Sequence, residues 1–549
     1  SSDINMQNPV QITMDQNRSI TAAFSEQLSG GEVNINGSIN FVHNWPYSKS
    51  YQQPSSYSRL ETMATEKIIE AKESEYVEGE MIIGFDRIIV QSQQQKVLSD
   101  LDFQLMAHQP KLNSYLVRVR EGTTADAIQR MLTVNGVRYV EPNYIYRAFS
   151  VYPDDEYYSY QWHYPQIRLP QAWESVTGSS MIRIGVLDTG VDSQHPDLKN
   201  NINLEDGYNF PGQNRDTTDQ FGHGTHVAGT IAADTNNNVG VAGIMWDADI
   251  VPVKVLDDEG YGTNWNIAQG ILYASGLTDN PIISQPVDVI NMSLGGATDS
   301  QSIREAVIES SNAGVILVAA AGNSNTINPM YPASYPEVIS VGSVELNYPN
   351  EPVRAPYSCY GDTLDIVAPG GNTRVDTDNN EFGDGVLSTT FEGSGDSKNY
   401  HYIFYQGTSM ASPHVTGLVG LMLSNGISSS DVRDILHNTA FDIGDDGFDI
   451  ESGYGLVNAY WAVNQVDSIK ILIGERDGDT INEINSKTFG IKDSSYLLEN
   501  LPSGTYSVYA WIDVTGNNVI DSGDYLAESP LNNFESGEYQ IDLLLKELQ

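Results

Sequence analysis

The sequence predicts an α/β protein in which helices cover both faces of a mostly parallel sheet, with smaller β-rich units on either side. Short apolar strands alternate with helix-like segments through residues 150–465, which is the pattern of a parallel sheet. The stretch before this region mixes strands with helices, and the residues after about 466 show strand patterns alone. A chain of 549 residues is too long for one hydrophobic core, so we expect roughly three to four domains.

Composition excludes several classes of partner. The chain has 72 acidic and 28 basic residues, a net charge of -44, which would repel nucleic acid and anionic membranes. No apolar stretch approaches the roughly 18 residues of a membrane-spanning helix, so we expect no membrane span. Cys359 has no second cysteine to pair with, which excludes an internal disulfide and a cysteine-based zinc site. We expect Cys359 to be a small buried apolar residue.

Residues 1–60 are interpreted as a partial β module and a linker. Two alternating apolar segments around a polar turn predict a hairpin over residues 9–24. The alternation in EVNINGSINFV, residues 32–42, predicts a further strand of the same small unit. Residues 47–58 are rich in serine, glutamine and tyrosine around a proline, which is typical of a linker.

Residues 61–149 are predicted to form a ferredoxin-like unit. GEMIIGF and YLVRVRE have strand patterns, and a helical segment around QQQKVLSDL separates them. Thr123 and Thr124 cap a second helix that ends at Gly136, and VRYVEPNYIYRAF returns as a strand. The order strand, helix, strand, strand, helix, strand within about seventy residues is that of the ferredoxin-like fold.

Residues 150–465 are predicted to form the α/β domain, and residues 466–549 a C-terminal β-sandwich. The strands expected in the first are IRIGVLD, IVPVKVL, DVINMSL, GVILVAAAG, VISVGSV and LDIVAPG. Glycine-rich turns follow these strands, and ligand sites in such folds collect at the carboxyl ends of the strands. The strands expected in the second are IKILIG, YLLENL, TYSVYAWIDV and YQIDLLL.

Four side chains at strand or helix ends are candidates for chemistry. Asp188 ends a strand, His223 opens a glycine-flanked helix, and Asn323 closes a buried strand. Ser409 lies where a glycine turn runs into an apolar helix, so its hydroxyl is near unpaired backbone N–H groups that favour negative charge. Taken one by one, these residues could equally be turn residues or a helix cap. His226 lies three residues after His223 and allows a metal site, but no acidic ligand joins the pair in the metalloprotease pattern, so metal is the weaker interpretation.

Five segments in this order resemble the subtilisin-like serine proteases: VLDTGVDSQHPDL, GHGTHVAGT, NMSLGG, VAAAGN and GTSMASPH. The ferredoxin-like unit is similar to the inhibitory propeptide of the secreted members. The resemblance implies that Ser409 is the nucleophile, that His223 is the general base and then the acid, and that Asp188 orients the imidazole. It also implies an oxyanion hole made by the Asn323 side chain and the Ser409 backbone N–H.

The resemblance further implies that substrate binds as an added β-strand between two edges of a cleft. Its edges correspond to Gly260, Tyr261 and Gly262 on one side and to Ser293, Leu294 and Gly295 on the other. Glycines suit these positions because backbone must approach backbone. Met330 is a departure: if it faces the first specificity pocket, its thioether narrows that pocket.

Calcium is the cofactor that the resemblance implies. The family's tight site corresponds to the side chains of Asp155, Asp197 and Asn237, the carbonyls of Val239 and Val241, and one carbonyl from Asp234 or Thr235. A second candidate is residues 513–524, which resemble an EF-hand-type loop with ligands Asp513, Thr515, Asn517, Val519, Asp521 and Asp524. That loop departs from the pattern at its sixth position, Asn518, and at its last, Asp524. Both stretches could instead be ordinary polar turns.

The sequence therefore predicts a secreted, calcium-stabilised serine endopeptidase zymogen, extracellular or attached to the cell surface, and monomeric. It would hydrolyse proteins and peptides through an acyl-enzyme, with broad specificity and a preference for a large apolar or aromatic residue before the scissile bond. Its own propeptide would inhibit it, ending at a cut between Phe149 and Ser150. Two alternatives remain: a processing protease of narrow specificity, and a surface adhesion protein with a silent protease domain, against which the complete catalytic set argues.

Overall fold

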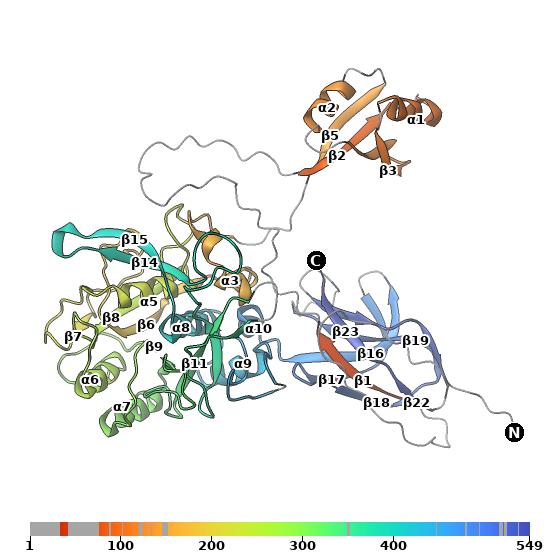
Figure 1. Ribbon diagram of the computed structural model, residues 1–549. Coiled ribbons are helices and arrows are strands. Elements are labelled where there is room, and N and C mark those ends of the chain that lie inside the picture. Colours follow the sequence, from red (N-terminus) through yellow and green to blue (C-terminus); the bar gives the residue numbers. More distant parts are fainter. Residues whose placement is uncertain are drawn as a thin grey trace. The chain divides into compact units, whose positions relative to one another are not determined.

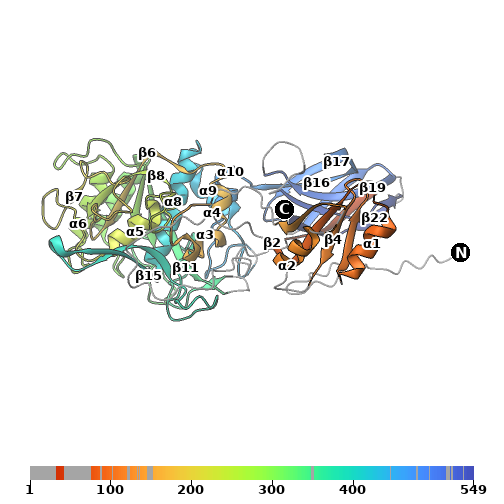
Figure 2. The same ribbon diagram turned by 90° about the horizontal axis from the view of Figure 1, so that it is seen from above.

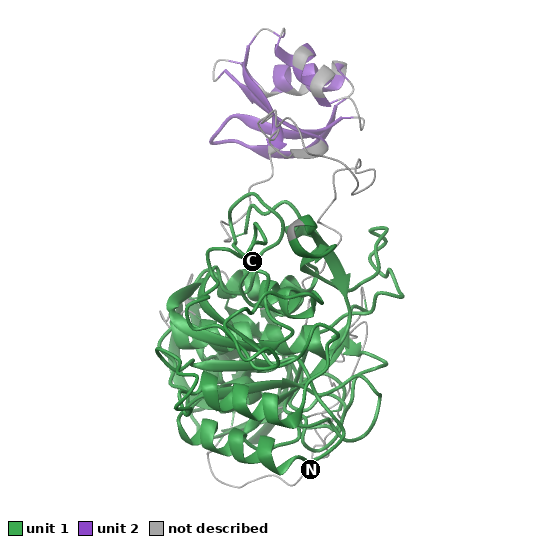
Figure 3. Cartoon of the chain, turned by 90° about the vertical axis from the view of Figure 1, so that its left-hand side faces the viewer, with its two compact units in different colours: residues 1–53, 151–549 green, residues 54–150 purple. Residues whose placement is uncertain are grey.

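The computed structural model describes residues 33–41, 76–86, 89–101, 103–119, 124–132, 134, 136–144, 152–347, 352–445, 447–477, 480–493, 495–514, 520, 524–535 and 537–548. The chain divides into two compact units, residues 54–150 and the remainder (Figure 3). The expected hairpin at 9–24, the linker at 47–58 and the cut after Phe149 lie outside the described residues. Within the described ranges, every helix is too short or too polar to cross a membrane.

The smaller unit has the expected ferredoxin-like order of elements. Its antiparallel strands pair in the order β3-β4-β2-β5, and α1 and α2 connect them. The bounds are β2 Tyr76–Phe85, α1 Gln91–Asp100, β3 Gln104–Gln109, β4 Ser114–Arg118, α2 Thr124–Leu132 and β5 Val137–Tyr144. Alternate residues of the central strands, such as Met81, Ile83, Tyr115 and Val117, are fully buried in one core. The period-two pattern in the sequence therefore marks the buried face correctly.

The larger unit contains a mostly parallel sheet in the order β12-β11-β10-β9-β6-β8-β7, with β13 also paired to β11 (Figure 1). Only the short β12 is recorded as antiparallel within it. The strands are β6 Gly178–Asp188, β7 Tyr208–Asn209, β8 Asp247–Lys254, β9 Val289–Met292, β10 Ile316–Ala320, β11 Val338–Glu345, β12 Val353–Arg354 and β13 Ile366–Pro369. This confirms the expected fold class. Their buried patterns are nearly continuous, as expected for strands covered on both faces.

Helices cover this sheet on both sides. The side chains of α5 and α8 share a core with Ile184 and Val186 of β6, whereas α6 and α7 pack in a second core with Leu187. Successive residues of β6 thus face opposite helix layers, as the pleat of a strand requires. The helices are α3 His163–Gln166, α4 Leu169–Ala172, α5 His223–Ala232, α6 Asn264–Ala274, α7 Gln301–Asn312, α8 Thr408–Ser424, α9 Val432–Thr439 and α10 Ala459–Asn464, with short 3₁₀ turns at Tyr158–Tyr160 and Gly395–Ser397.

A hairpin of β14, Val386–Glu392, and β15, Asn399–Tyr405, leads directly into α8. It runs along one side of the larger unit (Figure 1 and Figure 2). The side chains of Ser388 and Thr389 donate to backbone carbonyls of α5, so the hairpin and α5 are held in register. The hairpin therefore connects the helix that begins at His223 to the helix that carries Ser409.

The C-terminal strands form one sheet that has both antiparallel and parallel pairs. Its strand order is β17-β16-β19-β20-β23-β1-β18, with β21 paired to β19 and β22 paired to β1. Its members are β16 Ser468–Asp477, β17 Thr480–Gly490, β18 Ser495–Leu501, β19 Gly504–Ile512, β20 Tyr525–Glu528, β21 Asn532–Phe534, β22 Gly537–Gln540 and β23 Leu543–Glu547. The remaining member is β1, Val33–Phe41, from the opposite end of the chain. This differs from the expectation of a separate N-terminal module, because the apolar face of β1 is buried by C-terminal strands.

Candidate active site

Asp188 and His223 meet where the end of β6 faces the start of α5, although residues 189–222, which include β7, separate them in the chain. Asp188 is the last residue of β6, and His223 is the first of α5, behind Gly222 with φ 93°. The His223 Nδ1 lies 2.7 Å from Asp188 Oδ1, which also accepts from the Thr189 backbone N–H at 2.7 Å. The carboxylate is completely buried, while the imidazole side chain is 22 % exposed. The pair therefore has one fixed end and one end open to solvent.

The charge of Asp188 sets the protonation of the imidazole. Burial works to lower the pKa of His223, but the Asp188 carboxylate, its hydrogen bond and the more distant Asp219 outweigh burial and raise the pKa above its usual 6.5. Because Nδ1 is held by the carboxylate, Nε2 is the ring nitrogen left for chemistry.

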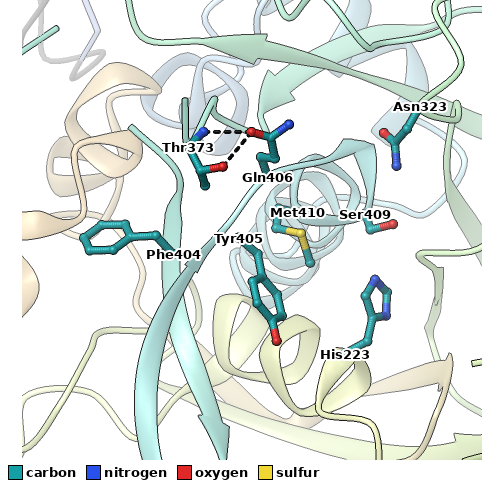
Figure 4. Close-up of a pocket in the computed structure, with 8 residues that line it drawn as sticks. All are labelled: His223, Asn323, Thr373, Phe404, Tyr405, Gln406, Ser409 and Met410. Atoms are coloured by element: carbon teal, nitrogen blue, oxygen red, sulfur yellow. Dashed lines mark hydrogen bonds between the residues drawn. The ribbon is translucent and has the colours of Figure 1, made fainter. Parts of the chain in front are cut away.

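Ser409 and Asn323 face His223 across one pocket. Ser409 is the second residue of α8, and Asn323 lies three residues beyond β10. The pocket has a volume of about 360 Å³, and these three side chains line it together with Thr373, Phe404, Tyr405, Gln406 and Met410 (Figure 4). In this view Ser409 lies between the His223 ring and the Asn323 carboxamide. The four residues expected to carry chemistry thus meet, with Asp188 behind His223.

The Asn323 carboxamide has a fixed orientation. Its Oδ1 accepts from the Thr408 backbone N–H at 2.9 Å and from the Thr408 hydroxyl at 3.0 Å. The amide nitrogen is therefore the end directed toward Ser409 (Figure 4). A side chain at Gly407, φ 149°, would put its Cβ 3.3 Å from that nitrogen, so glycine keeps the approach open.

The Ser409 hydroxyl donates to the Ser293 carbonyl at 3.1 Å, and the Ser293 hydroxyl donates to the Ser409 carbonyl at 2.8 Å. This pair ties the start of α8 to the segment that follows β9. It also places Ser293, one of the expected substrate-binding residues, against the expected nucleophile. In the structure the hydroxyl of Ser409 is thus engaged by a backbone carbonyl instead of the imidazole.

The other expected substrate-binding residues lie on two exposed segments. Tyr261 is 74 % exposed, and its backbone is held by Asp257, whose carboxylate accepts from the Tyr261 N–H at 2.8 Å. Gly262 forms a bridge with Leu256. On the other side, a Cβ added at Gly295 would lie 3.2 Å from the Cβ of Met330. Glycines at these positions leave backbone accessible, as an added strand requires.

Met330 is the residue whose thioether would narrow the first specificity pocket if it faces that pocket. A Cβ added at Gly322, next to Asn323, would lie 2.9 Å from the Cγ of Met330, so the thioether side chain packs between Gly322 and Gly295.

The wall formed by Thr373 and Gln406 was missed by sequence reasoning. Gln406 Oε1 accepts from both the backbone N–H and the hydroxyl of Thr373 at 2.8 Å (Figure 4). The only available signal was that Gln406 immediately precedes the glycine turn before Ser409.

His226 does not join His223 in a metal site. It is fully buried, its Nε2 lies 3.1 Å from the carbonyls of Val386 and Ile403, and its ring stacks on Tyr405. Burial lowers the pKa of His226 to about 3. The histidine therefore packs α5 against the β14–β15 hairpin, and the weaker metal interpretation is not supported.

The first calcium candidate gathers oxygen atoms around Asp197, which is fully buried. Asp197 accepts from the Val241 N–H at 2.9 Å and from the Asn237 side chain at 3.1 Å. Asp155 accepts from the Asn236 N–H at 2.8 Å, and its other oxygen is buried without a hydrogen-bond partner among the described residues. An orphaned buried carboxylate oxygen is what a hard cation would satisfy.

Electrostatics agree with a cation at this place. Burial raises the pKa of Asp197 to about 7 and that of Asp155 to about 6, and the negative charges of neighbouring aspartates add to both increases. Of the two alternatives for a further carbonyl, that of Asp234 accepts from the Asn237 side chain at 2.8 Å. The Asp234 carboxylate itself turns to Asn200, and the Thr235 hydroxyl donates to Ala233. The donor set fits calcium, with Val239 in the same turn.

The second calcium candidate is described only at its ends. Thr515, Asn517, Val519 and Asp521 lie outside the described residues, whereas Asp513 and Asp524 lie within them. Asp524 is fully buried, and its carboxylate accepts from the Trp511 ring N–H at 3.0 Å and from the Val514 N–H at 2.9 Å. Asp524 therefore closes the base of this loop through hydrogen bonds, and its calcium role stays a prediction.

A third acidic group was missed by sequence reasoning. Asp376, Asp378 and Asp384 each place a carboxylate oxygen within 4.8 Å of the others, in the loop that follows Thr373. One oxygen of the buried Asp384 has no hydrogen-bond partner among the described residues. The signal was the spacing D-x-D-x-N in DTDNNEFGD, which supplies hard oxygen atoms at alternate positions. This loop could hold a cation next to the pocket wall.

Comparisons with known proteins agree with this geometry. A model of the subtilase family matches residues 179–455, and a model described as the fervidolysin N-terminal prodomain matches residues 62–143. A thermophilic serine proteinase of Bacillus sp. (strain AK1) is 35 % identical over 389 residues, covering 71 % of this chain and 88 % of the relative. Thermitase from Thermoactinomyces vulgaris is 37 % identical, covering 58 % of this chain and 98 % of the relative.

Further relatives extend the match to both regions. Fervidolysin from Fervidobacterium pennivorans is 31 % identical over 433 residues, covering 71 % of this chain and 58 % of the relative. A solved structure of a protease from Pseudoalteromonas arctica PAMC 21717 superposes with a TM-score of 0.51 at 36 % identity, covering 57 % of this chain and 99 % of that chain. The subtilase model spans half of the chain, and the relatives are aligned over most of their length. The chain therefore belongs to the subtilase family and is a serine endopeptidase preceded by a prodomain.

Proposed function

We propose that the protein is a calcium-stabilised zymogen whose catalytic residues are Asp188, His223 and Ser409, with Asn323 in the oxyanion hole. The observation that carries this proposal is the single pocket in which His223, Asn323 and Ser409 meet, with Asp188 bonded to the far side of the imidazole. We also propose that the enzyme is secreted and monomeric, in keeping with its strong net negative charge of -44.

The proposed reaction begins when the Ser409 hydroxyl turns from Ser293 to His223. Its oxygen attacks the carbonyl carbon of the scissile peptide bond while Nε2 of His223 takes the hydroxyl proton. Asp188 holds the imidazole and stabilises the imidazolium. The negative charge on the former carbonyl oxygen is bound by the Asn323 amide and the Ser409 backbone N–H.

The tetrahedral intermediate then collapses. The C–N bond breaks, His223 gives its proton to the leaving amine, and an ester on Ser409 remains. Water attacks the acyl carbon of this ester with His223 again as base, the bond from that carbon to the Ser409 oxygen breaks, His223 returns the proton to the Ser409 oxygen, and the carboxylic acid product leaves. Calcium takes no part in these steps. At Asp155, Asp197 and Asn237 it would neutralise buried carboxylates and tie the turn after α5 to the start of the catalytic domain.

A direct test uses casein as substrate. The purified enzyme should release peptides from casein, and a serine-directed fluorophosphonate should label Ser409 and stop the release. Labelling without release from casein would favour a processing protease of narrow specificity. Absence of both in correctly folded, processed protein would contradict the assignment of the catalytic serine.

The fall of kcat/KM at acid pH should follow the protonation of the His223 imidazole. Only the neutral imidazole can accept the proton, so kcat/KM should fall as the pH falls through the His223 pKa. Because Asp188 and its hydrogen bond raise this pKa, the midpoint is expected above 6.5. A pH series of kcat/KM with a peptide substrate measures it. A midpoint below about 5.5 would contradict the charge coupling described here.

Removing calcium should lower the melting temperature. A cation that binds only the folded state and is present at a hundred times its Kd stabilises by about 2.7 kcal/mol, so excess EGTA should lower Tm by several degrees. Asp197→Asn should abolish this EGTA effect. Asp234→Asn is the matched control, because the Asp234 carboxylate faces Asn200, so the effect should persist. An unchanged Tm in protein known to contain calcium would contradict a structural role for the ion.

The mature enzyme should begin at Ser150 or within two or three residues of it. The proposed register puts Phe149 in the first specificity pocket, Ala148 beside His223 and Tyr146 in the fourth pocket. Burying one aromatic ring contributes about 1.5–3 kcal/mol, which favours this register over a one-residue slip. N-terminal sequencing of the processed enzyme checks it, and Phe149→Asp should slow the cut while Phe149→Tyr should not. A start before Tyr139 or after Asp155 would contradict this register.

A further inference from the structure

The strand β1, Val33–Phe41, lies inside the C-terminal β domain although it precedes the prodomain in the chain (Figure 1). One edge of β1 pairs with β18 in antiparallel fashion. The other edge pairs in parallel with β22 along its first half and with β23 along its second half. The strand is therefore an interior member of the sheet, bonded on both sides by strands from the last 55 or so residues of the chain.

The side chains of β1 fit this position. Val33 and Ile35 are completely buried, and Ile39 is 4 % exposed, in a core to which the C-terminal residues Leu498, Leu501 and Leu543 also belong. This alternation is the period-two pattern of a strand with one buried face. Removing the strand would expose this apolar face and the core beneath it to water.

Polar contacts fix the register of β1. The Ser38 backbone N–H and hydroxyl each donate to Asp542 Oδ1 at 2.9 Å. The Ile541 N–H donates to the Asn36 carbonyl at 2.8 Å. A one-residue slip would break these bonds and turn the apolar side chains to the wrong face.

Gly37 lies where β1 comes very near the backbone of Ile541. A Cβ at this position would lie 1.7 Å from the Ile541 carbonyl oxygen and 2.5 Å from its carbonyl carbon. That oxygen also accepts from the Tyr496 hydroxyl at 2.6 Å, so it is held in place. The host strands therefore accept a glycine at this point and exclude any larger residue.

From these contacts we propose that the C-terminal β domain is a binding site for the N-terminal segment of the same protein, and that the segment stays bound when its covalent link to the catalytic domain is cut. The chain from β1 to the catalytic domain runs through residues 42–150, of which residues 54–150 belong to a separate compact unit. A cut after Phe149 removes the covalent link, so β1 is then held in the C-terminal domain by its sheet contacts. That consequence for maturation rests on the proposed function, whereas the strand binding itself does not.

The test cuts the chain without using its own activity. A recognition sequence for a site-specific protease is placed between residues 47 and 58 of full-length Ser409→Ala protein, and the added protease makes the cut. Size-exclusion chromatography followed by mass spectrometry then determines whether the N-terminal fragment co-elutes with the rest of the cut protein. Co-elution at near one-to-one stoichiometry is expected. Separation of the fragment from the parent protein under native conditions would overturn the proposal.

Two variants locate the contact. Gly37→Ala should lower the retained fraction at least tenfold, because the added methyl group meets the Ile541 carbonyl. Gly504→Ala is the matched control in the same sheet: its nearest neighbour is 3.7 Å from the added Cβ, so retention should be unchanged. Equal retention in Gly37→Ala and the parent would overturn the assigned register.

A milder variant serves if Gly37→Ala does not fold. Asp542→Ala removes the acceptor of both Ser38 hydrogen bonds and leaves the apolar contacts in place. The cut fragment should then dissociate several-fold faster than from the parent protein, measured by the loss of co-elution with time. An unchanged dissociation rate would overturn the role given to this contact. Because Ser409 is absent throughout, a failure of self-processing cannot be mistaken for a failure of strand binding.

Discussion

Replacing Ser409 with alanine is expected to yield full-length protein with the prodomain still joined and with almost no peptidase activity. This variant removes the hydroxyl assigned as nucleophile, which lines the same pocket as His223. Loss of the nucleophile from a subtilisin costs about 10⁶-fold in kcat, and we expect a loss of that order here. Release of peptides from casein and the mass of the chain after expression in a protease-deficient host measure the two effects.

Ser424→Ala is a suitable control for this variant. It removes a hydroxyl from the far end of the same helix, where Ser424 donates to the Gly420 carbonyl. This control should be processed and active. Normal processing of Ser409→Ala in a host without other proteases would contradict the assignment of the nucleophile.

Replacing Asp188 with asparagine is expected to lower kcat by about 10⁴-fold without unfolding the protein. The new side chain has nearly the same shape but can no longer hold the Nδ1 proton of His223, so the imidazole loses the tautomer that accepts a proton at Nε2. The variant also removes the largest influence that raises the His223 pKa. The acid limb of the residual activity should therefore move to lower pH, which a stopped assay of casein hydrolysis across pH can detect.

The control for Asp188→Asn is Asp216→Asn. Asp216 is exposed, and its side chain accepts from the Thr218 N–H at 3.1 Å. The Asp216→Asn substitution removes the same charge as Asp188→Asn but does so away from the imidazole. Its kcat and acid limb should stay close to those of the parent enzyme. An Asp188→Asn variant with the same acid limb as its parent would show that the carboxylate does not control His223.

The sequence marks Asp188, His223 and Ser409 as candidates because each lies at or next to the end of a regular element, whereas their roles were predicted from the resemblance of the five motifs. Asp188 ends a continuous apolar strand, and His223 and Ser409 start apolar helices behind glycines with positive φ. Strand ends and helix starts can be recognised from the local sequence. In a parallel sheet the carboxyl ends of the strands lie along one edge, so residues at these positions are expected near one another. The hydroxyl bond from Ser409 to Ser293 is not local, since it joins residues 116 apart, and no pattern in the sequence indicates it.

The C-terminal domain shows where sequence reasoning failed. The alternation of residues 32–42 correctly predicts a strand, but an alternating pattern does not say which strands lie beside it. The strand β17, Thr480–Gly490, was missed because most of its side chains are exposed and polar, so it has no apolar period. The loop from Asp376 to Asp384 was missed because its carboxylates gather through the turn and not through an apolar pattern.

The position of β1 also has a consequence for how the protein is made. Ser38 and Asp542, which contact one another, are 504 residues apart, so this part of the C-terminal domain has a very high contact order. During synthesis β1 emerges before the prodomain and the catalytic domain, and its partners exist only once the strands up to β23 have been made. A chain that stops early leaves the partners of β1 incomplete, and a chain that starts at Ser150 leaves β18, β22 and β23 without their shared neighbour. Unpaired edges of this kind promote association between chains, so the sheet is protected only when the segment before the prodomain and the strands after the catalytic domain are both present.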